Sequence, residues 1–186
     1  MSEKKEKLIA AAIKLFAEKG FDNTSTQNIS KEAGVATGTL FKYFKNKEQL
    51  IIDAYIQCKL AMVGALKQEL NPHADFDEMM WHIWNQSVDW SLAHPDKQNF
   101  MMQVKFSRLA DCLTLEKVQG EFLFFQMALK NAHRDGKIAD IPLDLVEQTL
   151  SSFFNLAIDY ISQRPEGREE MKKTIFKMAM QSLTPQ

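Results

Sequence analysis

Side chains suited to contacting a polyanion are concentrated between residues 37 and 47. Hydroxyl groups can hydrogen-bond to phosphates or base edges, and a lysine ammonium can bind the acceptor atoms of guanine. A glycine permits close backbone approach, and an aromatic edge can pack on sugars or thymine methyl groups. The residues with this chemistry are Thr37, Gly38, Thr39, Phe41, Lys42, Tyr43 and Lys47. They predict a nucleic-acid contact surface, with Lys42 as a direct base reader.

Two short helices separated by a sharp turn would present these side chains together. Ser25 or Thr26 can cap the first helix, and Gly34 can end it because glycine readily adopts a positive φ. A second helix of about two turns is expected over residues 37–43. The first helix would brace the second helix, which protrudes from the protein. A protruding helix of this size fits into the major groove of DNA. The small core beneath them is predicted to contain Ile29, Ala33, Val35, Leu40 and Phe44.

A longer helix is expected directly after this pair. Asn46 and Gln49 have the spacing of a capping box, and apolar residues then recur at helical spacing until Asn71 and Pro72 break the pattern. Lys47 falls in the first turn, where its ammonium and the helix N-terminus both favour a phosphate. The alternative for Lys47 is an ordinary solvated surface lysine.

The whole chain has the pattern of an all-α protein. Apolar residues recur at three and four positions, and strand-like alternation is hard to find. The first helix should cover residues 4–19 and end at Gly20, after which Phe21 turns back onto it. Capping residues and prolines predict five more helices after the long one, for about nine in all. These are 76–94 opened by Asp75 and Glu78, 95–109 from Pro95, 114–133 capped by Thr114, 142–163 from Pro142, and a last helix from Pro165.

Thr26 begins a run of residues with a specific pattern. It contains Thr26, Ile29, Ser30, Ala33-Gly34-Val35-Ala36-Thr37-Gly38-Thr39-Leu40-Phe41, Tyr43-Phe44, Asn46-Lys47-Glu48 and Leu50. This run resembles the tetracycline-repressor (TetR) family of bacterial transcription regulators, whose usual pattern is close to T-x-x-x-I-A-x-x-A-G-V-S-x-G-T-L-Y-x-Y-F-x-S-K-E-x-L. With Leu15-Phe16 and Gly20-Phe21, the resemblance covers roughly residues 8–52, about a quarter of the chain.

The resemblance implies that the seven residues named above are DNA contacts. It adds Thr26 and Gln27 from the first short helix. The amide of Gln27 can pair with adenine, so Gln27 joins Lys42 as a direct base reader.

Three departures from the family pattern matter. Phe41 replaces the commoner tyrosine, which removes a hydroxyl and leaves only packing. Ala36 stands where serine is common, so the helix cap is expected to shift toward Thr37. Ser30 replaces the usual alanine but is small enough for close helix contact.

Charge is distributed unevenly along the chain. Residues 1–50 hold nine lysines and six acidic residues, a balance of +3. Residues 51–186 hold fourteen basic and eighteen acidic residues, a balance of -4, so the whole chain has a net charge of -1. A basic head on an acidic body favours DNA at the head alone, although chance can produce an excess of this size. The predicted domains are a DNA-binding domain over residues 1–47 and a ligand-binding and dimerisation domain over 48–186.

Dimerisation is expected because one short recognition helix contacts too few base pairs for useful specificity. Such heads usually act in twofold pairs about one helical turn, ~34 Å, apart on double-stranded DNA. The last two helices suit a four-helix bundle across a twofold axis, and the resemblance implies the same use. The alternative is that they only close the core of one subunit. The predicted interface of the homodimer contains Leu150, Phe154, Ala157, Ile158, Ile161, Met171, Ile175 and Met178.

The rest of the second domain is rich in Phe, Met and Trp. Most such side chains in a helical protein form core, whereas the TetR family uses this bundle as a ligand cavity, which Met and aromatic residues line adaptably. Arg108 can meet an anionic ligand there, with surface exposure as the alternative. The predicted pocket residues are Met62, Trp81, Trp84, Phe100, Val104, Arg108, Phe122, Phe125 and Gln126.

Other kinds of function find no support in the motifs. A phosphate loop, a nucleophile elbow, an HExxH motif and a metal-ligand spacing are not found, so neither an enzyme nor a cofactor is predicted. No apolar run approaches the ~20 residues of a membrane span, and the N-terminus does not have the pattern of a signal peptide. Cys58 and Cys112 fit small core residues in a reducing compartment, with a thiol sensor as the alternative. The predicted location is the cytoplasm.

The predicted function is therefore an operator-binding transcriptional regulator, a homodimeric repressor that a small, largely apolar ligand releases from DNA. Two alternatives stay open: a ligand-binding or carrier protein without operator binding, and a ligand-independent DNA-binding protein. The sequence does not decide between repressor and activator.

Overall fold

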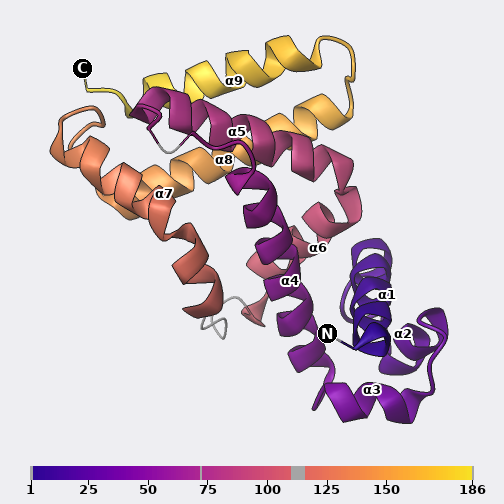
Figure 1. The fold of residues 1–186 in the computed structure, drawn as a ribbon. Coiled ribbons are helices and arrows are strands. Elements are labelled where there is room, and N and C mark those ends of the chain that lie inside the picture. Colours follow the sequence, from indigo (N-terminus) through magenta and orange to yellow (C-terminus); the bar gives the residue numbers. More distant parts are fainter. Residues whose placement is uncertain (1, 72, 110–115, 186) are drawn as a thin grey trace. The chain divides into compact units, whose positions relative to one another are not determined.

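The computed structural model describes residues 2–71, 73–109 and 116–185, with backbone only at 116–119. This part of the chain contains nine α-helices and no strand, which confirms the predicted all-α class (Figure 1). The helices are α1 (Glu3–Lys19), α2 (Thr26–Glu32), α3 (Thr37–Tyr43), α4 (Lys47–Lys67), α5 (Phe76–Ala93), α6 (Pro95–Lys105), α7 (Glu116–Arg134), α8 (Leu143–Ser162) and α9 (Arg168–Leu183).

Several helix starts follow the predicted capping chemistry. Ser25 Oγ accepts a hydrogen bond at 3.1 Å from the backbone N–H three residues later, at the start of α2. Asn46 Oδ1 accepts one at 2.8 Å from the N–H of Gln49 at the start of α4. At α5 both halves of a capping box form, because Glu78 N–H donates to Asp75 Oδ1 at 2.9 Å and Asp75 N–H donates to Glu78 Oε2 at 3.4 Å.

Three predicted boundaries are wrong. α9 begins at Arg168 because Gly167, with φ 73° and ψ 16°, is left-handed and cannot belong to a right-handed helix. α4 ends at Lys67, two residues before the positive φ of Glu69 (57°). α6 ends at Lys105, four residues short of the predicted limit. The predicted cap Thr114 lies outside the described residues.

The chain forms two compact units, and the first contains α1, α2, α3, α6 and part of α4. Its limits are Met1–Ala61 with His94–Val118. The rings of Phe16 and Phe100 stack with centroids 6.0 Å apart, and Phe21 meets both of them edge-on. Gln103 Nε2 donates to the carbonyl of Phe16 at 3.0 Å, near the end of α1. Thus α6 and α1 share one core. The proposed domain limits of 1–47 and 48–186 are a division by role, whereas these units are a division by packing.

The second unit, Met62–Ala93 with Gln119–Gln186, buries apolar residues of α5, α7, α8 and α9 in two clusters. Phe153 and Phe176 are partly buried and pack against both clusters. One cluster contains Phe76, Met80, Leu129, Ala132, Ile138, Val146, Leu150, Ala179 and Leu183, and the other contains Trp84, Val88, Ala157, Ile161 and Ile175.

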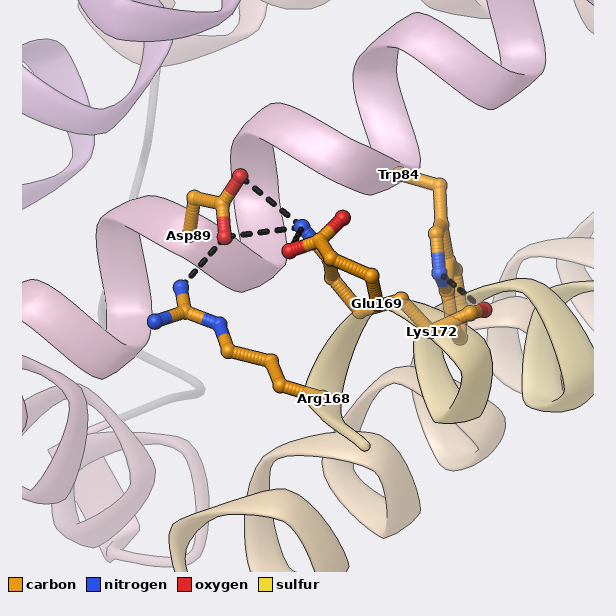
Figure 2. A network of polar contacts seen from close by, with 5 residues as sticks. All are labelled: Trp84, Asp89, Arg168, Glu169 and Lys172. Atoms are coloured by element: carbon orange, nitrogen blue, oxygen red, sulfur yellow. Dashed lines mark hydrogen bonds and ion pairs between the residues drawn. The ribbon is translucent and has the colours of Figure 1, made fainter. Parts of the chain in front are cut away.

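An ion network around the buried Lys172 joins α5 to α9 in the second unit (Figure 2). The side chain of Lys172 is only 1 % exposed, and its Nζ lies 3.0 and 3.1 Å from the two carboxylate oxygens of Asp89. Arg168 also donates to Asp89, and Glu169 lies 2.7 Å from the Lys172 ammonium. Trp84 Nε1 donates to the backbone carbonyl of Lys172 at 3.1 Å. These partners compensate the buried charge and fix α9 against α5.

α4 has the length and composition of a possible membrane span, contrary to the expectation that no segment does. Its mean hydropathy reaches 1.3, and it is the one described helix that passes this test. A single such helix is weak evidence, because core helices of soluble proteins also pass. Leu50, Ala54 and Cys58 are buried inside the protein, which accounts for the apolar composition of α4.

Candidate nucleic-acid interface

The loop between α1 and α2 is tied to its surroundings on both sides. Thr24 is buried, and its Oγ1 donates to the carbonyl of Gly20 at 2.8 Å. Lys47, in the first turn of α4, places Nζ 2.9 Å from the carbonyl oxygen of Phe21 and 3.4 Å from that of Thr24. The loop therefore holds α2 at a defined position. The phosphate contact of Lys47 stays a prediction, and these two carbonyls compete for its ammonium.

The turn between α2 and α3 has the geometry that the sequence predicts. Gly34 has φ 67°, and its N–H donates to the carbonyl of Lys31 at 3.1 Å. The N–H of Val35 donates to the carbonyl of Ser30 at 2.9 Å. Ser30 is 1 % exposed, which agrees with the close helix contact expected there. The two helices are thus joined by a turn that favours glycine.

α3 has one buried side and a large exposed surface. Leu40 is fully buried, whereas Gly38, Phe41 and Lys42 are exposed, with Phe41 at 52 %. On α2, Gln27 is exposed as well. The remaining predicted contacts are partly exposed: Thr26, Thr37, Thr39, Tyr43 and Lys47. Side chains that can contact phosphates and bases therefore lie on the side of α3 that does not pack against the rest of the protein.

The core beneath this surface matches the prediction at three positions. Ile29, Leu40 and Phe44 are at most 1 % exposed, whereas Ala33 and Val35 are partly exposed. Large buried side chains from α2, from α3 and from the residue after α3 thus hold these two helices against the core of the first unit.

The predicted shift of the α3 cap toward Thr37 is wrong. Ala36 is the N-cap residue, with φ -65° and ψ 142°, and Thr37 is the first residue of the helix. Alanine has no side-chain acceptor, so α3 starts without a side-chain cap.

Burial shifts the pKa of two neighbouring groups on α4. It raises the pKa of the Cys58 thiol to about 12, so this thiol stays protonated at neutral pH, as expected for a core residue. Burial, aided by the charge of Lys105, lowers the pKa of Lys59 to about 8. Cys112 lies outside the described residues.

The predicted dimer interface stays a prediction, although four of its residues pack in the core of their own subunit. Leu150, Ala157, Ile161 and Ile175 are 8 % exposed or less and lie in the clusters of the second unit. Burial of these four residues agrees with the alternative that the last two helices close the core of one subunit. Phe154, Ile158 and Met171 also pack against the second cluster, and Met178 is 48 % exposed. Sequence reasoning missed other exposed apolar residues of α8, namely Leu145, Leu156 and Tyr160.

The predicted pocket residues are divided between the two units. Phe100, Val104 and Arg108 belong to the first, where Phe100 and Val104 are fully buried and Arg108 is exposed. The second contains Met62, Trp81, Trp84, Phe122, Phe125 and Gln126. Trp84 and Phe125 pack in its core clusters, so packing accounts for part of this set, and the pocket stays a prediction. Among the described residues, no three His, Cys, Asp or Glu side chains form a group that could hold a metal ion.

Comparison with known sequences places the site in a family. The family of bacterial regulatory proteins called the tetR family matches residues 8–54, which contain the two short helices and their flanking segments. YerO, an HTH-type transcriptional regulator of Bacillus subtilis, is 38 % identical over 73 residues, a segment that is 38 % of this chain and only 25 % of YerO. YvdT, another HTH-type regulator of that organism, is 26 % identical over 195 residues, covering 98 % of this chain and 96 % of YvdT.

Solved structures extend the likeness to the whole fold. A tetR family transcription regulator from Shewanella sp. PV-4 has a TM-score of 0.90 and 26 % identity, covering 98 % of this chain and 99 % of the other. FadR from Bacillus subtilis, crystallised with stearoyl-CoA, has a TM-score of 0.77 at 17 % identity, covering 96 % of this chain and 98 % of FadR. The all-helical fold and its N-terminal helix-turn-helix define a DNA-binding protein of the helix-turn-helix class. Residues 8–54 match the tetR family of bacterial regulatory proteins, and the whole chain has the fold of a TetR family transcription regulator.

Proposed function

We propose that two copies of this chain bind an operator through α3 and release it when a small, largely apolar molecule binds the helical body. The observation that carries the proposal is the exposed surface of α3. Leu40 is fully buried beneath it, while Phe41 and Lys42 point into solvent next to three partly exposed hydroxyl residues. A short protruding helix with this chemistry fits a major groove.

Each predicted contact has a role that its chemistry supports. Gln27 and Lys42 are the base readers, since both are exposed and can bond to purine acceptor atoms. Phe41 packs on sugars or thymine methyl groups, and Gly38 lets the backbone approach closely. The phosphate contacts are Thr26, Thr37, Thr39, Tyr43 and Lys47.

The dimer is proposed to form through the exposed apolar side chains of α8 and α9. Leu145, Leu156 and Tyr160 are separated by eleven and four residues, so they lie along one side of α8. They are 47, 45 and 38 % exposed, and Met178 on α9 is 48 % exposed. α8 and α9 pack against each other, so a second copy can add two helices to form a four-helix bundle.

The effector is proposed to be a small, largely apolar molecule, and repression the consequence of operator binding. A ligand can release DNA only if it binds the DNA-incompetent state more tightly, so some element must connect its site to the head. α4 belongs to both compact units and is the natural connection. Because the FadR crystal contains stearoyl-CoA, long-chain acyl-CoA thioesters are the first effectors to test. The proposed site of action is the cytoplasm.

Binding of a selected operator at graded salt concentrations tests the proposal. DNA fragments that the protein retains from a random pool supply the operator, and fluorescence anisotropy gives its affinity. Several phosphate contacts per dimer predict that affinity falls at least tenfold between about 50 and 200 mM salt. A selected operator that binds no better than a shuffled one would contradict operator recognition. If no acyl-CoA tested changes the operator affinity, acyl-CoA thioesters are excluded as effectors, and the proposal of operator binding is not affected.

A further inference from the structure

The first turn of α1 contacts the end of α3 within the first unit. Ser2 Oγ and Tyr43 Oη lie 2.9 Å apart, at hydrogen-bonding distance. Lys5, one turn further on, places Nζ 5.3 Å from the ring centroid of Phe44 and donates to Asp53 Oδ2 at 2.9 Å. These three contacts hold the start of α1 against Tyr43, Phe44 and α4.

The Ser2 hydroxyl is not used in the way that its position in the helix favours. Ser2 is the N-cap residue of α1, with φ -72° and ψ 135°, and a serine there normally accepts a bond from a backbone N–H of the first turn. Its side chain makes no such bond. The backbone carbonyl of Ser2 accepts from the N–H groups of Lys5 and Glu6, and the hydroxyl is directed to Tyr43 instead.

We propose that Ser2 is a positioning residue for the phosphate contact of Tyr43. A hydroxyl has one proton to donate and two lone pairs that accept. When Ser2 donates to Tyr43 Oη, the phenol proton must point elsewhere and can be donated to a phosphate oxygen. Hydrogen bonds in series polarise one another, so the Ser2 bond also strengthens this donation. The inference rests on the proposed function, because it requires that Tyr43 contacts DNA.

A double-mutant cycle on operator affinity tests this role. The variants Ser2→Ala, Tyr43→Phe and their combination are compared with the wild type by fluorescence anisotropy at one salt concentration. Loss of one hydrogen bond corresponds to roughly fivefold weaker binding, so Ser2→Ala should weaken binding by about that factor and Tyr43→Phe by at least as much. The combined variant should bind like Tyr43→Phe alone, since Ser2 acts only through the Tyr43 hydroxyl.

Two controls separate positioning from a general structural effect. Ser2→Thr keeps the hydroxyl and should retain wild-type affinity. Ser182→Ala, at an exposed position of α9, should not change the affinity either. The melting temperature of Ser2→Ala should match the wild type within about 2 °C, because one exposed hydrogen bond contributes little to stability.

The failures are distinguishable. Additive losses in the combined variant, unchanged affinity in Ser2→Ala, or no recovery in Ser2→Thr would overturn the role of Ser2 and leave the proposed function standing. Unchanged affinity in Tyr43→Phe would overturn both the Tyr43 contact and the role of Ser2. A wild-type protein with no operator preference would contradict the proposed function itself.

Discussion

Phe41 and Lys42 are neighbours on α3, and both point into water. Exposure of a lysine ammonium to water does not reduce the stability of the fold. A phenylalanine that is 52 % exposed, in contrast, lacks part of the hydrophobic stabilisation that full burial would provide. The family pattern usually has a tyrosine here, whose hydroxyl would be solvated. Phe41 therefore leaves an apolar ring that only packing against another surface can cover. This residue fits a contact with sugars or thymine methyl groups better than a contact with phosphate.

Lys59 gives a prediction about the pH dependence of stability. Its pKa falls from 10.5 to about 8 on folding, chiefly through burial. Between pH 8 and 10.5 the unfolded chain therefore binds this proton and the folded chain does not, so the contribution of Lys59 to stability rises with pH in that window. Below pH 8 the folded protein holds a partly buried ammonium at a cost, and Lys59→Met should raise the free energy of unfolding at pH 7 by about 2 kcal/mol.

Urea unfolding of Lys59→Met and the wild type at pH 7 and pH 10.5 measures this effect. The difference in unfolding free energy between the two proteins should shrink toward zero at the higher pH, where the lysine of the folded protein is neutral and that of the unfolded chain is half deprotonated. A difference that stays constant, or a variant less stable at pH 7, would show that the ammonium is not destabilising in the folded protein.

At the scale of elements, two glycines differ in backbone conformation and can be compared directly. Gly34, in the turn after α2, has a positive φ of 67°, whereas Gly64 lies in the interior of α4. A Cβ added at either residue would meet nothing within 4 Å. Gly34→Ala should therefore lower the free energy of unfolding by about 1 kcal/mol through backbone strain alone. Gly64→Ala should raise it by up to about 1 kcal/mol, because alanine favours a helix interior. Thermal unfolding that shifts both variants in the same direction would contradict this account of the turn.

The sequence was informative wherever a short segment determines its own structure. Ser25, Asn46 and the Asp75–Glu78 pair predicted helix starts correctly, because a cap needs only residues within one turn. The start of α9 was missed since Gly167, not Pro165, sets the boundary. The contacts of Lys47 with Phe21 and of Ser2 with Tyr43 join residues 26 and 41 positions apart. Local sequence patterns do not predict contacts between residues so far apart in the chain.

Which side of a helix faces a partner is likewise a property of the whole molecule. α8 has apolar residues on more than one side, so its periodicity alone does not say which side is interior. In the structure the side with Leu150, Ala157 and Ile161 is buried, and the side with Leu145 and Leu156 is exposed. The exposed side is therefore the better candidate for contact with a second copy.

The proposed dimer predicts that a charge at Leu156 separates the subunits. Leu156 is 45 % exposed, so Leu156→Arg should leave the fold of one subunit intact while placing a desolvated charge in the interface. Sedimentation velocity should show the wild type as a dimer and Leu156→Arg as a monomer at micromolar concentration. Met127→Arg, on the exposed side of α7 at 60 % exposure, is the matched control and should remain dimeric. A dimeric Leu156→Arg would exclude this side of α8.

The central claim is that the exposed surface of α3 reads an operator, and the affinity of Lys42→Ala tests it most directly. Anisotropy with the selected operator and a shuffled fragment should show that the wild type prefers the operator and that Lys42→Ala loses most of this preference, about 1–3 kcal/mol per half-site. Lys137→Ala removes an exposed charge from the second unit and should bind like the wild type. Equal operator preference in Lys42→Ala and Lys137→Ala would contradict the claim.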